Sequence, residues 1–357
     1  MSETRLDKLR TEMESRRLDG LLLSDLTNVR YLTGFTGTAG LVLLTRKDAH
    51  FFTDFRYETQ AAKQVRDARV HLSRNGLGPT AAVAANRRRL KRVGYEADYV
   101  SVHSHRELKS RLRASLHATR GLVEELRLCK DEGELAAIEQ AVALADDACA
   151  SAASLMRPGL TEIEVSLELE RHMRLNGAQK ASFDFVIASG KRSALPHGVA
   201  SPKKLEPGDL VVMDLGCLYE GYCSDLTRTF CLGEPTPRQQ RVYATVRDAQ
   251  LLALEGLREG LTCKRADSLA RTYLEGRRLG KRFGHGLGHG VGLAIHEGPR
   301  LSAKSRETLR AGMVVTVEPG VYFPGWGGVR IEDMAVITAT GSRILTQSAK
   351  PASLPSV

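Results

Sequence analysis

The sequence has few aromatic residues and no long apolar run. Only 5% of its 357 residues are aromatic, and it contains a single tryptophan. No apolar stretch approaches the roughly 20 residues that a membrane-spanning helix needs. The charged segment at residues 1–20 lacks the apolar core of a secretory signal. The composition excludes a disordered or collagen-like chain, and we expect a soluble, cytoplasmic protein without membrane contact.

Paired cysteine motifs are also missing. No two cysteines form a CxxC pair. A chain of this length can bury a large core without disulfides. We therefore expect reduced thiols at all six positions, which are Cys129, Cys149, Cys217, Cys223, Cys231 and Cys263.

The net charge of +10 raises nucleic acid as a partner. The densest basic run is RRRLKR at 87–92, in the N-terminal third. No aromatic residues interleave with this run, as they would in a typical single-strand binding surface. The sequence favours a solvated basic helix face and does not favour nucleic-acid binding.

Alternating strand and helix patterns predict a small α/β domain over residues 1–124. A second domain is predicted over 125–357, beginning with a long helix at 123–156. A helix at 161–176 follows, opened by a capping box of Thr161 and Glu164. A helix pair followed by strands that carry acidic residues occurs twice, with the second pair at 236–258 and 264–278. This repetition indicates a diverged internal duplication.

Acidic residues interrupt the apolar strand patterns of the second domain. They are Asp214 in VVMDLG, Asp225 in YCSDLT, Glu318 in VTVEPG and Glu332 in VRIEDM. The expected strands are 209–216, 221–233, 313–323 and 329–338, with the first two forming a hairpin through 219–221. Burying lone carboxylates is costly. Ion pairs to Arg228 and Arg330 would explain any one acid, but four together favour a multivalent cation.

Histidines with small neighbours accompany these acids. His285 and His289 lie in FGHGLGHGVG, whose spacing does not fit a dinucleotide loop. His197 and His296 lie in LPHGV and AIHEG. Four carboxylates and one imidazole suit Mn²⁺, Co²⁺, Fe²⁺ or Zn²⁺ and suffice for two ions. Two ions can lower the pKa of a bridging water, which points to metal-assisted hydrolysis.

Five segments resemble the motifs of the pita-bread metallopeptidases of family M24. They are SFDFVIASGKRSALPHGVAS, GDLVVMDLGCLYEGYCSDLTRTF, FGHGLGHGVGLAIHEGPRLS, GMVVTVEPGVY and GWGGVRIEDM. Upstream, SDLTNVRYLTGFTG and FFTDFRYETQA resemble the N-terminal domain of the Xaa-Pro branch, which contains aminopeptidase P and prolidase. The resemblance implies an α/β (α+β) chain. A small creatinase-like N-terminal domain would precede a pita-bread catalytic domain with pseudo-twofold antiparallel sheets flanked by helices.

The resemblance also implies roles for individual residues. The metal ligands would be Asp214, Asp225, His289, Glu318 and Glu332, with Asp225 and Glu332 shared between two divalent ions. Mn²⁺ is favoured, with Co²⁺, Zn²⁺ and Fe²⁺ as alternatives. Glu318 would also exchange a proton with the attacking water. The further catalytic and substrate-binding positions would be His197, His285, His296 and Arg330. His296 would hydrogen-bond the scissile peptide or the developing oxyanion, and the other three would line the proline side and could hold a carboxylate.

The activity implied is hydrolysis of the Xaa-Pro bond at the N-terminus of dipeptides or short peptides by a metal-bridging hydroxide. The motifs do not separate prolidase from aminopeptidase P, although the length of the chain favours dipeptides. A homodimer is implied as well. The alternative is a non-catalytic pita-bread protein that binds a partner through its basic N-terminal domain.

Overall fold

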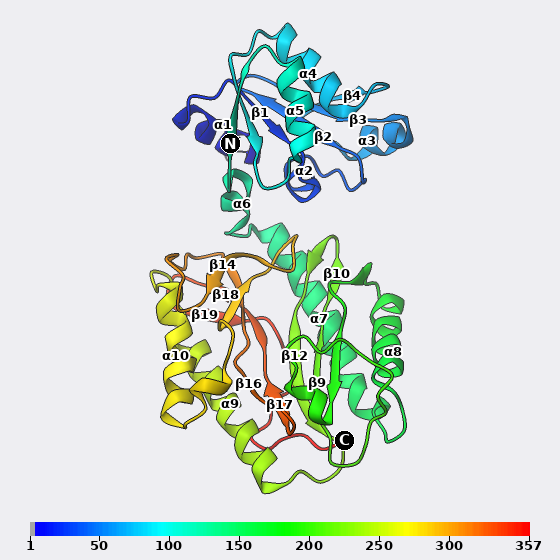
Figure 1. The fold of residues 1–357 in the computed structure, drawn as a ribbon, viewed down its shortest axis with the longest axis vertical. Helices are drawn as coiled ribbons and strands as arrows, with labels where there is room; N and C mark the ends of the chain where they lie inside the picture. Colours follow the sequence, from blue (N-terminus) through cyan, green and yellow to red (C-terminus); the bar gives the residue numbers. More distant parts are fainter. Residues whose placement is uncertain (1–3) are drawn as a thin grey trace. The chain divides into compact units, whose positions relative to one another are not determined.

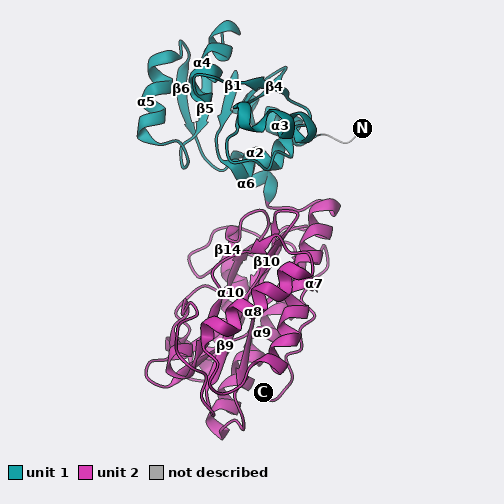
Figure 2. Cartoon of the chain, turned by 90° about the vertical axis from the view of Figure 1, so that its right-hand side faces the viewer, with its two compact units in different colours: residues 1–127 teal, residues 128–357 magenta. Residues whose placement is uncertain are grey.

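The computed structural model describes residues 4–357, and the chain divides into two compact units. Figure 2 colours them separately, the first over residues 1–127 and the second over 128–357. In the described residues, no helix is both long and apolar enough to cross a membrane.

The first unit contains a mixed six-stranded sheet with the order β4-β3-β2-β1-β5-β6. Its strands are β1 Gly20–Leu23, β2 Leu41–Thr45, β3 Ala49–Thr53, β4 Arg69–Leu72, β5 Arg92–Glu96 and β6 Ser115–Thr119. Its helices are α1 Arg5–Ser15, α2 Leu26–Thr33, η1 Phe55–Tyr57, α3 Glu58–Gln64, α4 Leu77–Arg87, α5 Val102–Arg111 and α6 Leu122–Arg127. Strands β1, β2 and β3 pair antiparallel, whereas β3–β4, β1–β5 and β5–β6 pair parallel.

The second unit contains only antiparallel strand pairs. Its helices are α7 Glu132–Leu155, α8 Glu162–Leu175, η2 Gly190–Ala194, α9 Pro237–Gly256, α10 Cys263–Gly276 and η3 Gly280–Arg282. Its strands are β7 Lys180–Ala181, β8 Val186–Ser189, β9 Leu210–Leu215, β10 Cys217–Tyr219, β11 Tyr222–Cys223, β12 Leu226–Cys231, β13 Gly288–Gly290, β14 Glu297–Leu301, β15 Val314–Val317, β16 Gly320–Phe323, β17 Gly327–Arg330, β18 Asp333–Ile337 and β19 Ser342–Ile344.

A helix pair covers the strands of each half of this unit, as the duplicated pattern predicts (Figure 1). In the first half, apolar residues of α7 and α8 pack on β8 and β9, with Leu169 and Met213 fully buried. In the second half, α9 and α10 pack on β15 and β18, with Val246 and Val315 fully buried. The fold is thus the expected pseudo-twofold arrangement of antiparallel sheets flanked by helices.

Helix caps explain one prediction that is confirmed and one that is wrong. The capping box of Thr161 and Glu164 opens α8 as predicted. The single helix predicted over 123–156 is in fact α6 and α7, separated at 128–131. Asp131 caps α7 by accepting from the Glu134 backbone N–H, while the Glu134 carboxylate accepts from the Asp131 N–H. This reciprocal pair fixes the start of α7 after the break.

Candidate active site

Three of the four acids lie at breaks between strands, so the expectation of four acids inside continuous strands is wrong. Asp225 falls between β11 and β12, Glu318 between β15 and β16, and Glu332 between β17 and β18. Only Asp214 lies within a strand, β9, where it pairs with Thr227 of β12. The predicted strands 313–323 and 329–338 each divide between two sheets at the acid. The side chains of all four acids nevertheless line one pocket.

Hydrogen bonds from other segments replace the missing ladder bonds at these breaks. The Glu318 N–H donates to the Leu287 carbonyl at 2.8 Å, and the Glu332 N–H donates to the Thr227 carbonyl at 3.1 Å. Thr227 also donates through Oγ1 to Glu332 Oε2 at 2.6 Å. The orientation of Glu332 is therefore set from strand β12, in the other half of the unit.

The structure brings five predicted residues together in one buried cluster. Ligand atoms of Asp225, His289 and Glu332 all lie within 4.8 Å of one another, in a grouping able to hold a metal ion. His289 Nε2 is 3.6 Å from Asp225 Oδ2 and 3.4 Å from Glu318 Oε1. Asp214 joins them in the lining of the same pocket.

The tautomer of His289 follows from its neighbours. Its Nδ1 lies 3.1 Å from the carbonyl oxygen of Gly290, which can only accept a hydrogen bond. Nδ1 therefore carries the proton, and the lone pair of Nε2 points to the carboxylates. A metal-binding histidine has this arrangement, with a backbone carbonyl fixing the ring from behind.

Asp214 is paired on one oxygen only. Its Oδ2 accepts from Arg330 Nη2 at 2.5 Å, while Oδ1 is buried with no hydrogen-bond partner. The ion-pair alternative thus holds for Arg330, whereas Arg228 pairs with Asp333 at 2.7 Å. A buried carboxylate oxygen without a partner is costly, which suits an oxygen that faces a cation.

Burial and mutual repulsion shift the pKa values in this cluster. Burial raises the pKa of Asp225 and of Glu332 well above the usual range, and neighbouring carboxylates raise both further. Burial also raises the pKa of Glu318 to about 7. The pKa of His289 is lowered to about 4, chiefly by burial, so its ring is neutral at pH 7. Acids that resist ionisation beside a neutral imidazole fit a site where divalent cations supply the missing positive charge.

The cluster opens into a pocket of about 360 Å³ that contains all the predicted substrate-binding positions. His197, His285, His296 and Arg330 line it together with Phe183, Val186 and Ile295. The rings of His289 and His296 meet edge to face, with centroids 4.4 Å apart. Burial lowers the pKa of His296 and brings that of His285 to about 4, so both rings are neutral at pH 7.

Two residues of the site were not among the sequence-based candidates. Tyr322 places its hydroxyl 3.0 Å from both Arg330 Nη1 and His285 Nε2. Tyr322 and Arg330 share a face of the β16–β17 pair, a relationship that depends on the strand register and could not be read from the sequence. Arg300 lines the pocket, and within residues 4–357 its guanidinium has no acidic partner. The sequence feature that could have identified Arg300 is its position four residues after His296, in the segment HEGPR.

A second acidic group lies within the first unit and has a structural explanation. Asp25, Glu96 and Glu124 have oxygens within 4.8 Å of one another. Asn28 Nδ2 donates to Glu96 and to Glu124, both at 2.7 Å. Asp25 caps helix α2 through the Thr27 N–H. These contacts join the start of α2 to the end of β5 and account for Glu96, Glu124 and one oxygen of Asp25, whose Oδ2 is buried without a hydrogen-bond partner.

Comparisons with known families cover nearly the whole chain. Residues 136–339 match metallopeptidase family M24. Residues 5–129 match the creatinase/prolidase N-terminal domain. An Xaa-Pro dipeptidase from Pyrococcus horikoshii is 38% identical over 94% of this chain and 95% of its own length. An uncharacterized peptidase from Bacillus subtilis is 44% identical over 97% of this chain and 98% of its own length.

Solved structures agree with this assignment. An Xaa-Pro dipeptidase from Bacillus anthracis has a TM-score of 0.97 at 44% identity and covers 99% of each chain. The prolidase from Pyrococcus horikoshii has a TM-score of 0.93 at 38% identity and covers 98% of this chain and 99% of its own. From its acid-and-histidine cluster and from these matches, the chain belongs to metallopeptidase family M24.

Proposed function

We propose that this chain is a metal-dependent Xaa-Pro dipeptidase. The observation that carries the proposal is the buried group of Asp225, His289 and Glu332, with ligand atoms within 4.8 Å, beside an Asp214 oxygen that lacks a partner. Relatives named Xaa-Pro dipeptidase and prolidase support the substrate class. Two divalent ions would be held by five residues, which are Asp214, Asp225, His289, Glu318 and Glu332.

Divalent ions in such a site polarise a carbonyl and make water a nucleophile near neutral pH. The residues around the ions would transfer protons, stabilise the developing negative charge and contact the substrate. Glu318 lines the pocket with Oε1 3.4 Å from His289 Nε2, so its carboxylate would be placed to take a proton from water and return it. His296 is neutral and lines the pocket, so its N–H can donate to the scissile carbonyl oxygen as negative charge develops. His197 and His285 would border the prolyl ring.

The contacts of the two arginines favour a dipeptide substrate. Arg330 already donates to Asp214, Tyr322, Thr227 and the Pro196 carbonyl. We therefore assign Arg330 to positioning Asp214 rather than to holding a substrate carboxylate. Arg300 is the lining cation whose guanidinium remains available for a free C-terminal carboxylate. The pocket volume of about 360 Å³ lies near the lower end of the usual 300–1,000 Å³ for small ligands.

The same proposal includes Mn²⁺ as the metal, a homodimer as the oligomeric state and the cytoplasm as the location. Mn²⁺ is supported by the carboxylate-rich donor set. A homodimer is supported by the resemblance of the N-terminal motifs to the Xaa-Pro branch. A cytoplasmic location is supported by six cysteines that are all unpaired.

The test is hydrolysis of Ala-Pro and of Ala-Pro-Ala by the purified chain, after chelation and after Mn²⁺ is restored. We expect Mn²⁺-dependent cleavage of Ala-Pro and much slower cleavage of the tripeptide. Asp214→Ala and Glu318→Ala should abolish both activities while the thermal unfolding transition persists. Wild-type turnover in either variant would overturn the site assignment. Faster cleavage of Ala-Pro-Ala would make the chain an aminopeptidase instead.

A further inference from the structure

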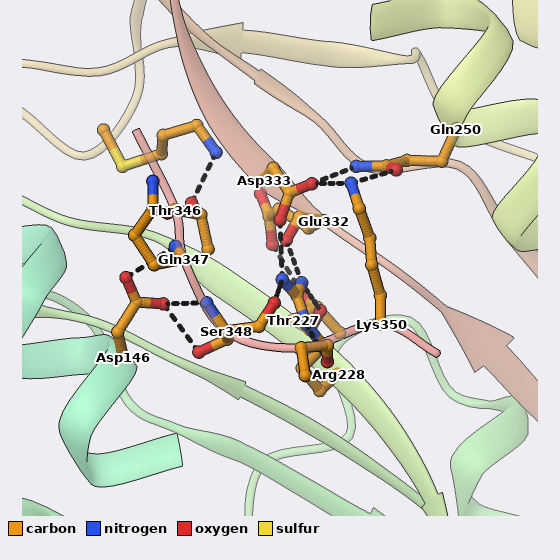
Figure 3. Close-up of polar contacts among 12 residues, drawn as sticks. Asp146, Thr227, Arg228, Gln250, Glu332, Asp333, Thr346, Gln347, Ser348 and Lys350 are labelled. Atoms are coloured by element: carbon orange, nitrogen blue, oxygen red, sulfur yellow. Dashed lines mark hydrogen bonds and ion pairs between the residues drawn. The ribbon is translucent and has the colours of Figure 1, made fainter. Parts of the chain in front are cut away.

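Arg228 is buried beside Glu332, and each N–H group of its guanidinium donates a hydrogen bond. Arg228 Nη1 donates to the carbonyl of Glu332 at 2.5 Å and to that of Thr227 at 2.9 Å. Nη2 donates to Asp333 Oδ1 and to the Ser348 carbonyl, both at 2.7 Å. Nε donates to the Ala349 carbonyl at 3.2 Å. All five N–H groups of Arg228 are thus used, which no other side chain could reproduce (Figure 3).

Asp333 is the second centre of this network and joins three parts of the chain. Its Oδ1 accepts from Arg228 of β12, and its Oδ2 accepts from Gln250 of α9 at 2.8 Å. Lys350 Nζ also bonds to Asp333 Oδ2 and donates to Gln250 Oε1 at 2.7 Å. The carboxylate of Asp333 is 1% exposed, so both of its cationic partners are needed to offset the cost of burial.

Lys350 reaches Asp333 because the C-terminal strap, residues 345–350, is fixed along its length. The backbone N–H groups of Gln347 and Ser348 donate to the Asp146 carboxylate at 2.7 and 2.8 Å. The Met334 N–H donates to Thr346 Oγ1 at 3.0 Å. Figure 3 shows the strap passing beside Glu332 and Asp333, with Asp146 of α7 holding it from the opposite side.

We propose that the C-terminal strap, through Lys350, positions Glu332 for metal binding. The Glu332 peptide is held on one side by Thr227 and on the other by Arg228. Arg228 in turn is oriented by Asp333 and by two carbonyls of the strap. Lys350 neutralises Asp333 together with Arg228, so its loss leaves Arg228 as the remaining cation on Asp333. The guanidinium would then shift toward that carboxylate and away from the Glu332 carbonyl that it holds through Nη1. Lys350 is a positioning residue, and the inference rests on the proposed metal centre.

The test compares Lys350→Met with the control Lys264→Met, which removes an exposed lysine from α10. Metal-free proteins are titrated with Mn²⁺ in a calorimeter, and their thermal unfolding is measured in parallel. Removing a group that bonds directly to a metal ligand weakens metal binding roughly 10–100-fold, and Lys350 acts through Asp333 and Arg228, so we expect Lys350→Met to weaken Mn²⁺ binding by about 10-fold. We expect Lys264→Met to bind Mn²⁺ as the wild type does. Asp146→Asn, which loosens the strap without touching Asp333, should shift the affinity in the same direction by a smaller factor.

The outcomes separate the inference from the proposed function. The inference would be overturned if Lys350→Met binds Mn²⁺ within twofold of the wild-type affinity and unfolds at a lower temperature. The strap would then contribute to stability and not to metal binding. A wild-type chain that binds no Mn²⁺, Co²⁺, Zn²⁺ or Fe²⁺ would instead overturn the metal centre itself. If Lys350→Met fails to fold, Asp146→Asn alone decides, because unchanged affinity there contradicts the proposal.

Discussion

Arg330 and Asp214 form a buried ion pair, with Nη2 and Oδ2 2.5 Å apart. The same guanidinium donates to Tyr322 and Thr227, and Thr227 donates to Glu332. One arginine therefore connects two of the proposed ligands. It contacts Asp214 directly and Glu332 through the Thr227 hydroxyl.

Arg330→Lys should separate charge from geometry. Lysine keeps the positive charge but cannot reproduce the planar set of contacts to Asp214, Tyr322 and Thr227. We expect kcat/KM for Ala-Pro to fall roughly 10–100-fold. The control is Arg343→Lys, at an exposed pair with Glu139 whose contribution is at most about 1 kcal/mol. Equal activity in the two variants would argue against a positioning role for Arg330.

Metal binding should release protons near neutral pH. Burial raises the pKa of Glu318 to about 7 and raises those of Asp225 and Glu332 well above the usual range. The metal-free acids thus hold protons that a cation displaces. We expect apparent Mn²⁺ affinity to fall as pH falls, and fewer protons to be released above pH 7 as Glu318 ionises. Calorimetry in two buffers of different ionisation enthalpy measures the proton count, and identical heats in both buffers would contradict the prediction.

Tyr322→Phe should impair activity more than stability. The variant keeps the ring and loses the hydroxyl that lies 3.0 Å from Arg330 and from His285. We expect kcat/KM to drop roughly 10–100-fold. Tyr243→Phe is the matched control, because the Tyr243 hydroxyl is buried without a hydrogen-bond partner. Removing that hydroxyl should leave activity unchanged and raise stability by about 1 kcal/mol, measured by chemical denaturation.

Gly320→Ala should crowd the pocket wall. An added methyl group would lie 2.5 Å from the Tyr322 hydroxyl and 3.3 Å from His285 Nε2. We expect displacement of both groups, a loss of stability of about 1–3 kcal/mol and a sharp fall in kcat. Gly276→Ala, where nothing lies within 4 Å at the end of α10, should leave activity unchanged and raise stability by at most about 1 kcal/mol. Unchanged kcat in Gly320→Ala would show that Tyr322 and His285 can move without cost.

Local signals predicted much of the fold and most of the cluster. The start of α8 followed from Thr161 and Glu164, three residues apart, because a cap involves only neighbouring residues. The side chains that gather around His289 were identified because acids in apolar segments stand out from their surroundings. The strand breaks at Asp225, Glu318 and Glu332 were not predicted, because they depend on which segment completes the backbone hydrogen bonds.

Partners far apart in sequence were the hardest to predict. Arg228 appeared as a possible partner of the four acids, yet it pairs with Asp333, 105 residues away. Lys350 and Gln250 carry no signal of their own, since single lysines and glutamines are common on surfaces. Only the packed structure shows that α9, β12 and the C-terminal strap meet at one carboxylate.

The bridge between Thr227 and Glu332 also has a consequence for folding. Each residue belongs to a different half of the second unit, and 105 positions separate them. Closing so long a loop is slow compared with forming either helix pair. During refolding, both halves should acquire their secondary structure before the bridge forms, and the capacity to bind a metal ion should return last, in step with the joining of the halves.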